Sequence, residues 1–485
     1  MEIRKRNGEM AAFDAEKIRA AMRLAFTATN VEITAQSLNS LLRAVLKRLE
    51  EVQQLTVENV QDQVEQQLMA EGYYETAKAY ILYREKRAKA RAMRERIAAR
   101  MEDPSLEGTL REIEADFDSA KYSLNLLAEQ YERLIREGMS VREQEKILVK
   151  AAIELTTMEA PRWEYLAARL QNHFFSRTVR EEMQKQNIQT FPEKLHDLAD
   201  EGLYGRYILE AYSEEELQMA GDMICPERDR LFTYAGLELL LKRYVIHTRD
   251  GKPMETPQEM FLGIALHLAM QEKRDRMEWV QRFYDMLSRM EVTMATPTMA
   301  NARKPFYQLS SCFVDVVPDS LDGIYRSIDS FAKVSKLGGG MGLYFGKVRA
   351  SGSAIRGFPG AAGGVIRWIK LVNDTAVAVD QLGMRQGAVA VYLDVWHRDL
   401  PEFLQLRTNN GDDRQKAHDV FPAVCYPDLF WKLAEKNIDA KWYLMCPHEI
   451  QTVKDYALED FWGKEWERRY WECVEDPRIE KRVLT

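Results

Sequence analysis

The stretch Cys312-Phe313-Val314-Asp315-Val316-Val317 is the first of three short apolar runs that decide the fold. The second run is Gly342-Leu343-Tyr344-Phe345, and the third is Ala388-Val389-Ala390-Val391-Tyr392-Leu393. Helical patterns near 320–336 and 363–380 separate the three runs. Because strand-like runs that alternate with helices indicate βαβ units, we predict an α/β fold with a parallel sheet or barrel after residue 290.

The chain upstream of these runs is predominantly helical, most clearly over residues 110–215. Two capping-box signatures mark helix starts, Ser140 with Glu143 and Ser213 with Glu216, the second near a predicted boundary at about 220. No titratable cluster stands out between 110 and 215, so we interpret this part as scaffold.

Residues 1–90 form a separate pattern. A basic segment with the turn Lys5-Arg6-Asn7-Gly8 predicts a hairpin, because both Asn and Gly tolerate positive φ. Asp14 is a predicted N-cap, and helices are expected around 34–50, 56–70 and from Tyr74 to Arg84. We interpret this part as a small α/β unit.

The segment from Arg84 to Arg100 contains eight basic residues and only two acidic ones, Glu85 and Glu95. A polyanion-binding helix and a solvated helix that links two domains are both compatible with this composition. The linking helix is favoured, because nucleic-acid binders usually interleave aromatic residues with their cations and this segment does not.

Composition narrows the class of protein. The chain has 485 residues and 68 − 76 = −8 formal charges, which argues against a nucleic-acid coat. The longest apolar stretch, Phe261–Met270, is far below the ~20 residues that span a bilayer. The five cysteines include no CxxC pair and so predict neither a disulfide scaffold nor a zinc site. We expect a cytoplasmic protein without nucleic-acid or membrane partners and without a metal of its own.

One cysteine lies where chemistry could occur. Cys312 follows Ser310 and Ser311 at the start of a predicted strand, so its thiol could be a redox group that faces a polar ligand. Cysteine also packs frequently in cores, and the local sequence alone favours packing. The remaining cysteines are expected to be structural: Cys225, Cys425, Cys446 and Cys473.

Three polar or glycine-rich stretches surround the strands. Gly338-Gly339-Gly340-Met341-Gly342 would let a ligand approach bare backbone, although it matches neither a Walker loop nor GxGxxG. The loops 346–357 and 381–387 carry arginines, which pair well with phosphates, although either loop could be an ordinary surface loop. Asp319-Ser320-Leu321 opens the helix near 320, and by itself a simple N-cap is the favoured interpretation.

Taken together and in this order, these segments resemble the large catalytic subunit of class I ribonucleotide reductase. The resemblance implies an ATP-cone over 1–92, a helical N-terminal domain over 110–215, and the first part of a ten-stranded α/β barrel over 220–485. The motifs that carry it are Ala77–Arg84, Asn125-Leu126-Leu127, Trp163–Leu170, Asp229–Ala235, Thr296-Pro297-Thr298-Met299 and Ser310-Ser311-Cys312, together with the glycine and arginine loops.

The resemblance also implies roles for individual residues. Cys312 would be one of two cysteines that reduce the ribose. The substrate pocket would include Thr296, Ser311, Gly339 and Gly340. A deoxynucleoside triphosphate would bind at a specificity site of Asp319, Ser320, Leu321, Arg349 and Arg356, and the loop that contains Gln381 and Arg385 would relay its identity. ATP or dATP would bind the cone at Lys5, Arg6, Lys17, Thr56 and Lys86, with Mg²⁺ accompanying these effectors; Ala11 and Val60 depart from the cone pattern.

The family's radical-bearing Asn-x-Cys-x-Glu loop has no counterpart in these residues, and neither has its mobile terminal cysteine pair. We therefore expect about four barrel strands here, no turnover by this chain alone, and a complementary C-terminal fragment that brings the radical cysteine, from either a split gene or a truncation. Further expected partners are the radical-generating small subunit, thioredoxin or glutaredoxin, and a second copy that packs through 320–336 and 363–380. The alternative is a regulatory protein that senses nucleotides without catalysis.

Overall fold

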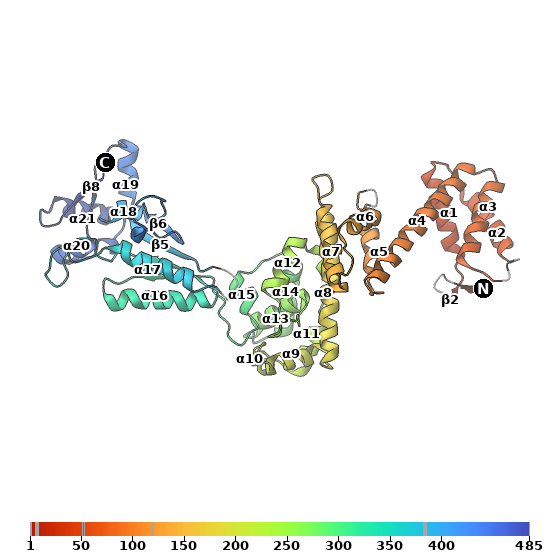
Figure 1. The fold of residues 1–485 in the computed structure, drawn as a ribbon, viewed down its shortest axis with the longest axis horizontal. Coiled ribbons are helices and arrows are strands. Elements are labelled where there is room, and N and C mark those ends of the chain that lie inside the picture. The colour runs from red at the N-terminus through yellow and green to blue at the C-terminus, as the bar shows by residue number, and fades with distance from the viewer. Residues whose placement is uncertain are drawn as a thin grey trace. The chain divides into compact units, whose positions relative to one another are not determined.

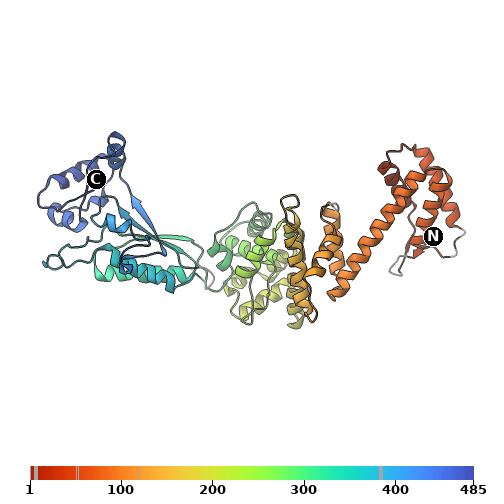
Figure 2. The same ribbon diagram turned by 45° about the horizontal axis from the view of Figure 1, so that its top comes forward.

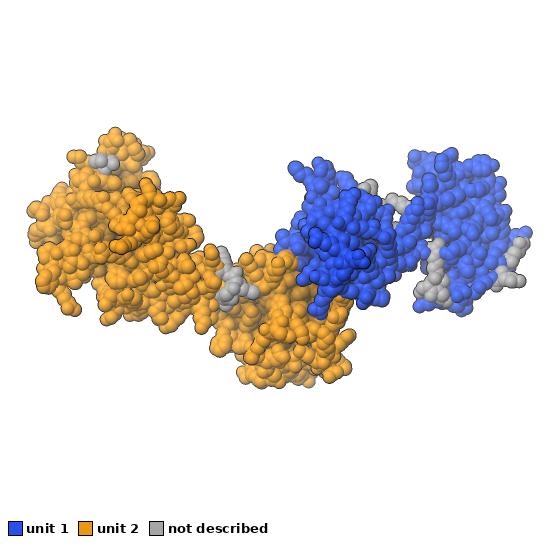
Figure 3. Space-filling view, in the orientation of Figure 1, with its two compact units in different colours: residues 1–174, 232–235 blue, residues 175–231, 236–485 orange. Residues whose placement is uncertain are grey.

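The computed structural model describes residues 2–4, 9–50, 52, 54–118, 121–381 and 386–484, except for the side chains of residues 86, 87 and 90. The predicted turn Lys5-Arg6-Asn7-Gly8, the Lys86 side chain and Arg385 lie outside the described residues. The chain forms two compact units (Figure 3), residues 1–174 with 232–235 and residues 175–231 with 236–485. The domain limits drawn from the sequence stay predictions.

The first unit begins with a two-stranded antiparallel ribbon and a helical cluster. Asp14 caps the first helix by accepting from the backbone N–H of Glu16 at 3.0 Å, which confirms the predicted N-cap. Met22, Val45 and Leu68 meet in the core of this cluster. The elements are β1 (Glu2–Arg4), β2 (Met10–Ala12), α1 (Ala15–Ala28), α2 (Ala35–Leu49), α3 (Val57–Ala70) and α4 (Tyr74–Arg100).

Helix α4 carries the basic segment as one continuous helix of 27 residues (Figure 1). Three of its arginines bond to carboxylates of the same unit: Arg84 to Asp62 and Glu65, Arg94 to Glu114, and Arg96 to Glu132. The C-terminal end of α4 contributes Ile97 to a second apolar core. These contacts support the interpretation of a linking helix.

The second core of this unit is built by α5 (Leu106–Asp116), α6 (Leu124–Leu134), α7 (Val141–Glu154) and the start of α8 (Trp163–Lys185). Ser140 and Glu143 form the predicted capping box at the start of α7. Leu127, Leu148 and Leu166 are fully buried in this core. The prediction that this part of the chain is helical is therefore confirmed.

The second unit starts with further helices. Ser213 and Glu216 form the second predicted capping box. Helix α13 is buried along nearly its whole length and packs against α14. A buried pair, Arg303 with Glu255, connects the end of this helical part to the segment before α13. Its elements are α9 (Phe191–Asp200), α10 (Arg206–Ala211), α11 (Glu214–Asp222), η1 (Pro226–Leu231), α12 (Tyr234–Arg243), α13 (Pro257–Ala269), α14 (Arg276–Ser288) and α15 (Thr296–Asn301).

A four-stranded parallel sheet follows, with the order β3-β4-β5-β6. The strands are β3 (Cys312–Val316), β4 (Gly340–Tyr344), β5 (Val389–Asp394) and β6 (Val420–Cys425). Helices α16 (Leu321–Lys336) and α17 (Val365–Ala378) connect the first three strands and lie side by side (Figures 1 and 2). The predicted βαβ pattern and the four expected strands are confirmed.

The remainder of the second unit packs into the same core as the sheet, with Trp442, Trp466 and Tyr470 stacked on one another. Strands β7 and β8 pair antiparallel. The elements are α18 (Leu400–Phe403), η2 (Asp413–Gln415), α19 (Asp428–Lys436), β7 (Trp442–Leu444), α20 (Pro447–Lys454), η3 (Leu458–Asp460), α21 (Gly463–Glu475) and β8 (Arg482–Leu484).

The two faces of the parallel sheet differ in burial. Leu343 and Val391 are fully buried among the helices. On the opposite face Val314 is 88% exposed and Phe421 55% exposed. A hollow of about 500 Å³ lies on this open face, lined by Val314, Asp315, Val316, Gly342, Tyr344, Tyr392 and Cys425. Because alternate residues of a strand share a face, Cys312 belongs to the open face with Val314.

Within the described part of the chain, none of the helices is both long enough and apolar enough to cross a lipid bilayer.

Candidate functional site

Cys312 begins β3 at the N-terminal edge of the sheet. It stands opposite Gly340 in the parallel register, and the carbonyl of Ser311 accepts from the backbone N–H of Gly340 at 2.8 Å. The hydroxyl of Ser311 lies 3.6 Å from the Cys312 sulfur. The Cys312 side chain is exposed, so the packing interpretation favoured by the local sequence is wrong. The strand directs alternate side chains away from the helices, which leaves this thiol available for chemistry.

The two predicted pocket glycines have different reasons to lack a side chain. A Cβ on Gly339 would lie 2.8 Å from Val334 and 2.9 Å from the Phe313 ring, so helix-to-strand packing requires glycine there. A Cβ on Gly340 would meet nothing closer than 3.5 Å. Packing therefore does not require glycine at position 340, and the approach of a ligand to its backbone stays a prediction.

Thr296 is the first residue of α15, and its hydroxyl lies 3.2 Å from that of Tyr244. The same short helix is connected to the segment that leads into β3. Thr298 donates to the carbonyl of Leu309 at 3.2 Å, and the Asn301 amide donates to that of Gln308 at 3.0 Å. These bonds hold α15 beside the entry to β3.

Gln381 lies against the glycine turn and is not among the residues that line the specificity cavity described next. Its side-chain amide donates to the carbonyl of Gly339 at 3.2 Å, and the side chain is 4% exposed. Among the described residues, which exclude 382–385 directly after it, its carbonyl oxygen has no hydrogen-bond partner.

A cavity of about 360 Å³ lies at the opposite, C-terminal end of β3 and β4. It brings together five residues predicted for the specificity site: Asp319, Ser320, Leu321, Arg349 and Arg356. The sequence analysis missed Ile355 and Trp368, which also line it. The only signal for these two was that Ile355 lies in the predicted arginine loop and Trp368 in the predicted helix of residues 363–380.

Asp319, Ser320 and Arg349, three polar residues of this cavity, already have hydrogen-bond partners. Asp319 accepts from the Nε of Arg349 at 2.9 Å and from its backbone N–H at 3.1 Å. The hydroxyl of Ser320 accepts from the backbone N–H of Gly323 at 3.1 Å, so the N-cap interpretation is correct for Ser320. Arg356 has φ of 48° in the turn beyond. The arrangement presents a cation and a helix N-terminus at one cavity, a combination that suits an anionic ligand.

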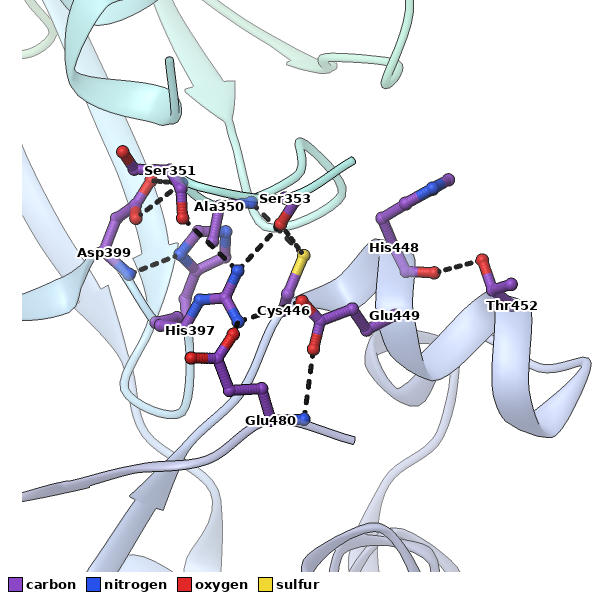
Figure 4. Close-up of polar contacts among 11 residues, drawn as sticks. Ala350, Ser351, Ser353, His397, Asp399, Cys446, His448, Glu449, Thr452 and Glu480 are labelled. Carbon is purple, nitrogen blue, oxygen red and sulfur yellow. Dashed lines mark hydrogen bonds and ion pairs between the residues drawn. The ribbon is translucent and has the colours of Figure 1, made fainter. Parts of the chain in front are cut away.

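Beneath the arginine loop lies a buried polar network that sequence reasoning also missed (Figure 4). His397, Arg398 and Asp399 follow β5 and are 0%, 8% and 4% exposed. Three consecutive polar residues between the apolar Trp396 and Leu400 were the available signal. The loop of residues 346–357 thus packs on buried polar side chains and is not an ordinary surface loop.

A half-buried polar cluster lies at the C-terminal ends of β4 and β5. The Tyr344 hydroxyl donates to Asp394. Burial raises the pKa of Asp394 to about 6, and burial raises that of Glu459 to about 7. Burial also raises the pKa of the Cys425 thiol to about 11, which makes this thiol a poor nucleophile.

The structure describes only some of the residues predicted to bind ATP or dATP in the cone. Lys17 is exposed on α1. Thr56 caps α3 in a capping box with Asn59, so its hydroxyl already has a structural function. Lys5, Arg6 and the Lys86 side chain lie outside the described residues. Among the side chains that the structure does describe, no group of three or more His, Cys, Asp or Glu could hold a metal ion.

Three family models match the chain in the order of its parts. An ATP cone domain matches residues 1–89, the all-alpha domain of ribonucleotide reductase matches 230–307, and its barrel domain matches 310–485. The parallel sheet, Cys312 and the cavity with Asp319 and Arg349 all fall within the barrel match.

Full-length relatives support the same assignment. A ribonucleoside-diphosphate reductase subunit alpha of Treponema pallidum is 57% identical over 491 aligned positions, which cover 100% of this chain and 58% of the relative. Similarly named subunits of Synechocystis and Helicobacter pylori are 42% and 39% identical over 69% and 72% of this chain, and 43% and 42% of their own lengths. The chain thus spans roughly half the length of these relatives. It belongs to the ribonucleotide reductase large-chain (alpha-subunit) family.

Proposed function

We propose that this chain provides one reducing thiol, part of the substrate pocket and the effector sites of a ribonucleoside-diphosphate reductase. The observation that carries the proposal is the exposed Cys312 thiol at the N-terminal edge of the sheet, opposite Gly340 in the parallel register. The names of the relatives favour nucleoside diphosphates as substrates.

The proposed reaction requires two thiols and a radical. A thiyl radical removes the 3′ hydrogen of the ribose and returns it at the end. Cys312 and a second thiol together supply two electrons and two protons: the C2′–OH bond breaks, the hydroxyl leaves as water, a hydrogen replaces it on C2′, and the two sulfurs form a disulfide. An external dithiol such as thioredoxin or glutaredoxin then resets the pair by exchange. Thr296, Ser311, Gly339 and Gly340 would position the substrate.

The radical cysteine and the second reducing thiol would lie on a further polypeptide segment, either covalently continuous with this chain or separate. The open face of the sheet supports this, because apolar side chains such as Val314 and Phe421 are exposed there and a parallel sheet is normally covered on both faces. Further barrel strands would cover that face, and a radical-generating small subunit would initiate the chemistry.

Two effector sites would regulate the reaction. A deoxynucleoside triphosphate would bind the cavity of Asp319, Ser320, Leu321, Arg349 and Arg356, with Gln381 and Arg385 in the relay loop. ATP or dATP would bind the cone through Lys17 and Thr56, with Lys5, Arg6 and Lys86. Mg²⁺ would accompany both triphosphates and this chain would hold no metal of its own. The protein would operate in the cytoplasm, where its five cysteines, all free in the structure, would form no structural disulfide.

A second copy of the chain would pack on α16 and α17. Leu321 is 62% exposed, Tyr325 53% and Val377 61%, and Tyr325 contacts Trp368 edge to face across the two helices. Exposed apolar side chains that adjoin the specificity cavity are suited to an interface that also completes it.

The test is turnover of a ribonucleoside diphosphate by this chain, mixed with the complementary segment and the small subunit. Cys312→Ser is expected to reduce turnover by at least ~100-fold while dTTP binding stays unchanged, because only the reducing thiol is lost. Cys225→Ser is the matched control, since Cys225 lies in the helical part and bonds to Glu227. Full turnover by Cys312→Ser would contradict the enzymatic proposal and favour a non-catalytic nucleotide sensor.

A further inference from the structure

We propose that Asp399 and Arg398 are positioning residues for nucleotide selection, because they anchor the loop between β4 and α17 that forms one wall of the specificity cavity. This inference rests on the proposed effector site and adds to it the residues that control its shape. Neither residue lines that cavity, so any influence on nucleotide binding must pass through the loop.

Asp399 connects two separate parts of the loop. Its carboxylate accepts from the backbone N–H of Ser351 at 2.9 Å and from that of Val365, the first residue of α17, at 2.9 Å (Figure 4 shows the bond to Ser351). Gly364, the N-cap of α17, has no side chain to cap the helix, and Asp399 supplies the missing acceptor. One buried carboxylate therefore holds the first half of the loop, at Ser351, against the start of α17.

Gly364 makes this contact possible. Its φ is +72°, and a Cβ there would lie 2.4 Å from the Asp399 carboxylate and 2.8 Å from the Ser351 nitrogen. Glycine is needed both for the left-handed conformation and for the close approach of the carboxylate.

Arg398 holds the same loop through different atoms. Its Nη2 donates to the hydroxyl of Ser353 at 2.8 Å and to the carbonyl of Ser351 at 3.3 Å. Its Nη1 donates to Glu449 at 2.9 Å and to Glu480 at 2.6 Å. The guanidinium therefore connects the loop to α20 and to the segment before β8, and the two carboxylates compensate its buried charge.

His397 and Cys446 also form hydrogen bonds with the backbone of the loop. The Nε2 of His397 donates to the carbonyl of Val348 at 2.9 Å, while its Nδ1 accepts from the backbone N–H of Asp399 at 3.1 Å. Burial lowers the pKa of His397, in accord with the neutral tautomer that these two bonds require. The Cys446 sulfur accepts from the backbone N–H of Ala350 at 3.3 Å.

The bonds to the loop hold residues that are close in sequence to those that line the cavity. Anchored positions 348, 350, 351 and 353 flank Arg349 and directly precede Ile355 and Arg356, which line the cavity together with Val348. If the anchor is lost, Arg349 and Arg356 no longer share one fixed geometry. A bound triphosphate must then order the loop at the expense of its affinity.

Two measurements on the 485-residue chain test the inference: amide hydrogen exchange without nucleotide, and titration with dTTP. We expect Asp399→Asn to speed exchange at residues 351–365 by at least about tenfold and to weaken dTTP binding by about tenfold, because an amide offers one acceptor oxygen where two N–H donors converge. Arg398→Lys keeps the charge but cannot span both sets of acceptors, so a similar loss is expected. If Asp399→Asn does not fold, the Arg398→Lys variant alone tests the inference.

Two control variants separate positioning from stability. Glu402→Gln removes a carboxylate in the same short helix, but Glu402 bonds to Arg482 at the surface and should leave dTTP affinity within about twofold. Val391→Ala creates a cavity in the core of the same sheet and should lower the unfolding midpoint without changing dTTP affinity.

The outcomes are distinct. Unchanged exchange and unchanged dTTP binding in both anchor variants would overturn the inference and leave the proposed function intact. If the wild-type chain itself binds no dTTP, the proposed effector site is wrong, and the exchange data alone decide the anchoring: faster exchange supports it and unchanged exchange refutes it.

Discussion

The carboxylate of Asp319 accepts both the side-chain and the backbone N–H of Arg349, a residue 30 positions later in the chain. Asp319 follows β3 and Arg349 follows β4, and these strands are parallel neighbours. The sheet therefore brings two separate loops together at its C-terminal edge. Arg349 also donates to the carbonyl of Ala354 at 2.7 Å, so its guanidinium is oriented before any ligand arrives.

Arg349→Gln should weaken dTTP binding by roughly 10- to 100-fold, because the variant loses a preoriented, charge-assisted contact to phosphate. Lys333→Gln is the control, since Lys333 is an exposed cation of α16 that pairs with Asp329. Isothermal titration of both variants checks the prediction. Equal affinities would remove Arg349 from the effector site.

Alkylation should distinguish the cysteines of this chain. With iodoacetamide, Cys312 should react at least about 100-fold faster than Cys446 and Cys473, because those two thiols are fully buried and burial raises the pKa of each. Peptide mass spectrometry over a time course measures the three rates. Comparable labelling of Cys312 and Cys446 would contradict the exposed position of Cys312.

Two half-buried carboxyls should make the free energy of unfolding depend on pH. The folded-state pKa values of Asp394 (about 6) and Glu459 (about 7) lie above the usual values near 4. Between about pH 4 and 7 these two groups thus bind more protons in the folded chain than in the unfolded chain, so their contribution to the free energy of unfolding falls as the pH rises. His267 and His397, whose pKa values are lowered by burial, contribute with the opposite sign. Asp394→Asn should recover about 3 kcal/mol or less at pH 7.5 while the Tyr344 hydroxyl keeps an acceptor.

Urea unfolding at pH 5 and pH 7.5 tests this dependence. Asp329→Asn is the control, because Asp329 is a surface carboxylate that pairs with Lys333. Its pH dependence should match that of the wild type. An unchanged pH dependence in Asp394→Asn would show that Asp394 is ionised at no cost in the folded chain.

Two glycine substitutions should differ in their cost to folding. Gly360 and Gly364 have φ of +75° and +72°, but a Cβ on Gly360 meets nothing within 4 Å. Gly360→Ala should cost ~1 kcal/mol of unfolding free energy, the penalty of a positive φ alone. Gly364→Ala should cost ~3 kcal/mol, because its ψ of −177° lies in a region essentially restricted to glycine and because the Cβ would displace the Asp399 carboxylate. Chemical denaturation measures both, and equal costs would mean that neither the backbone at Gly364 nor the Asp399 contact resists a side chain.

Local patterns predicted much of the fold. Capping signatures identified Ser140, Ser213 and Asp14 correctly, because a cap satisfies backbone N–H groups only a few residues away. The alternation of apolar runs and helices predicted the parallel sheet and its connecting helices, because each strand or helix is specified by a pattern of neighbouring residues. The shared order of motifs along the chain indicated the family, which no single motif could do.

The candidate site was predicted only in part. Residue types and their place beside strands identified Cys312 and the arginine loop, yet the local sequence favoured a packed thiol, because nothing in six residues says which face of a strand is covered. Trp368, Arg398 and Asp399 were missed, since their partners lie tens of residues away in sequence.

By itself the sequence determined the elements, because helix periodicity, capping and strand alternation depend on near neighbours in the chain. The order of its motifs indicated the family by resemblance. The tertiary structure alone decided that the Cys312 thiol is exposed beside Gly340 and that Asp319 meets Arg349. It also decided that Asp399 closes the loop between Ser351 and Val365. These relationships arise when parallel strands bring their ends together, and they depend on hydrogen bonds and packing between distant segments that no local pattern encodes.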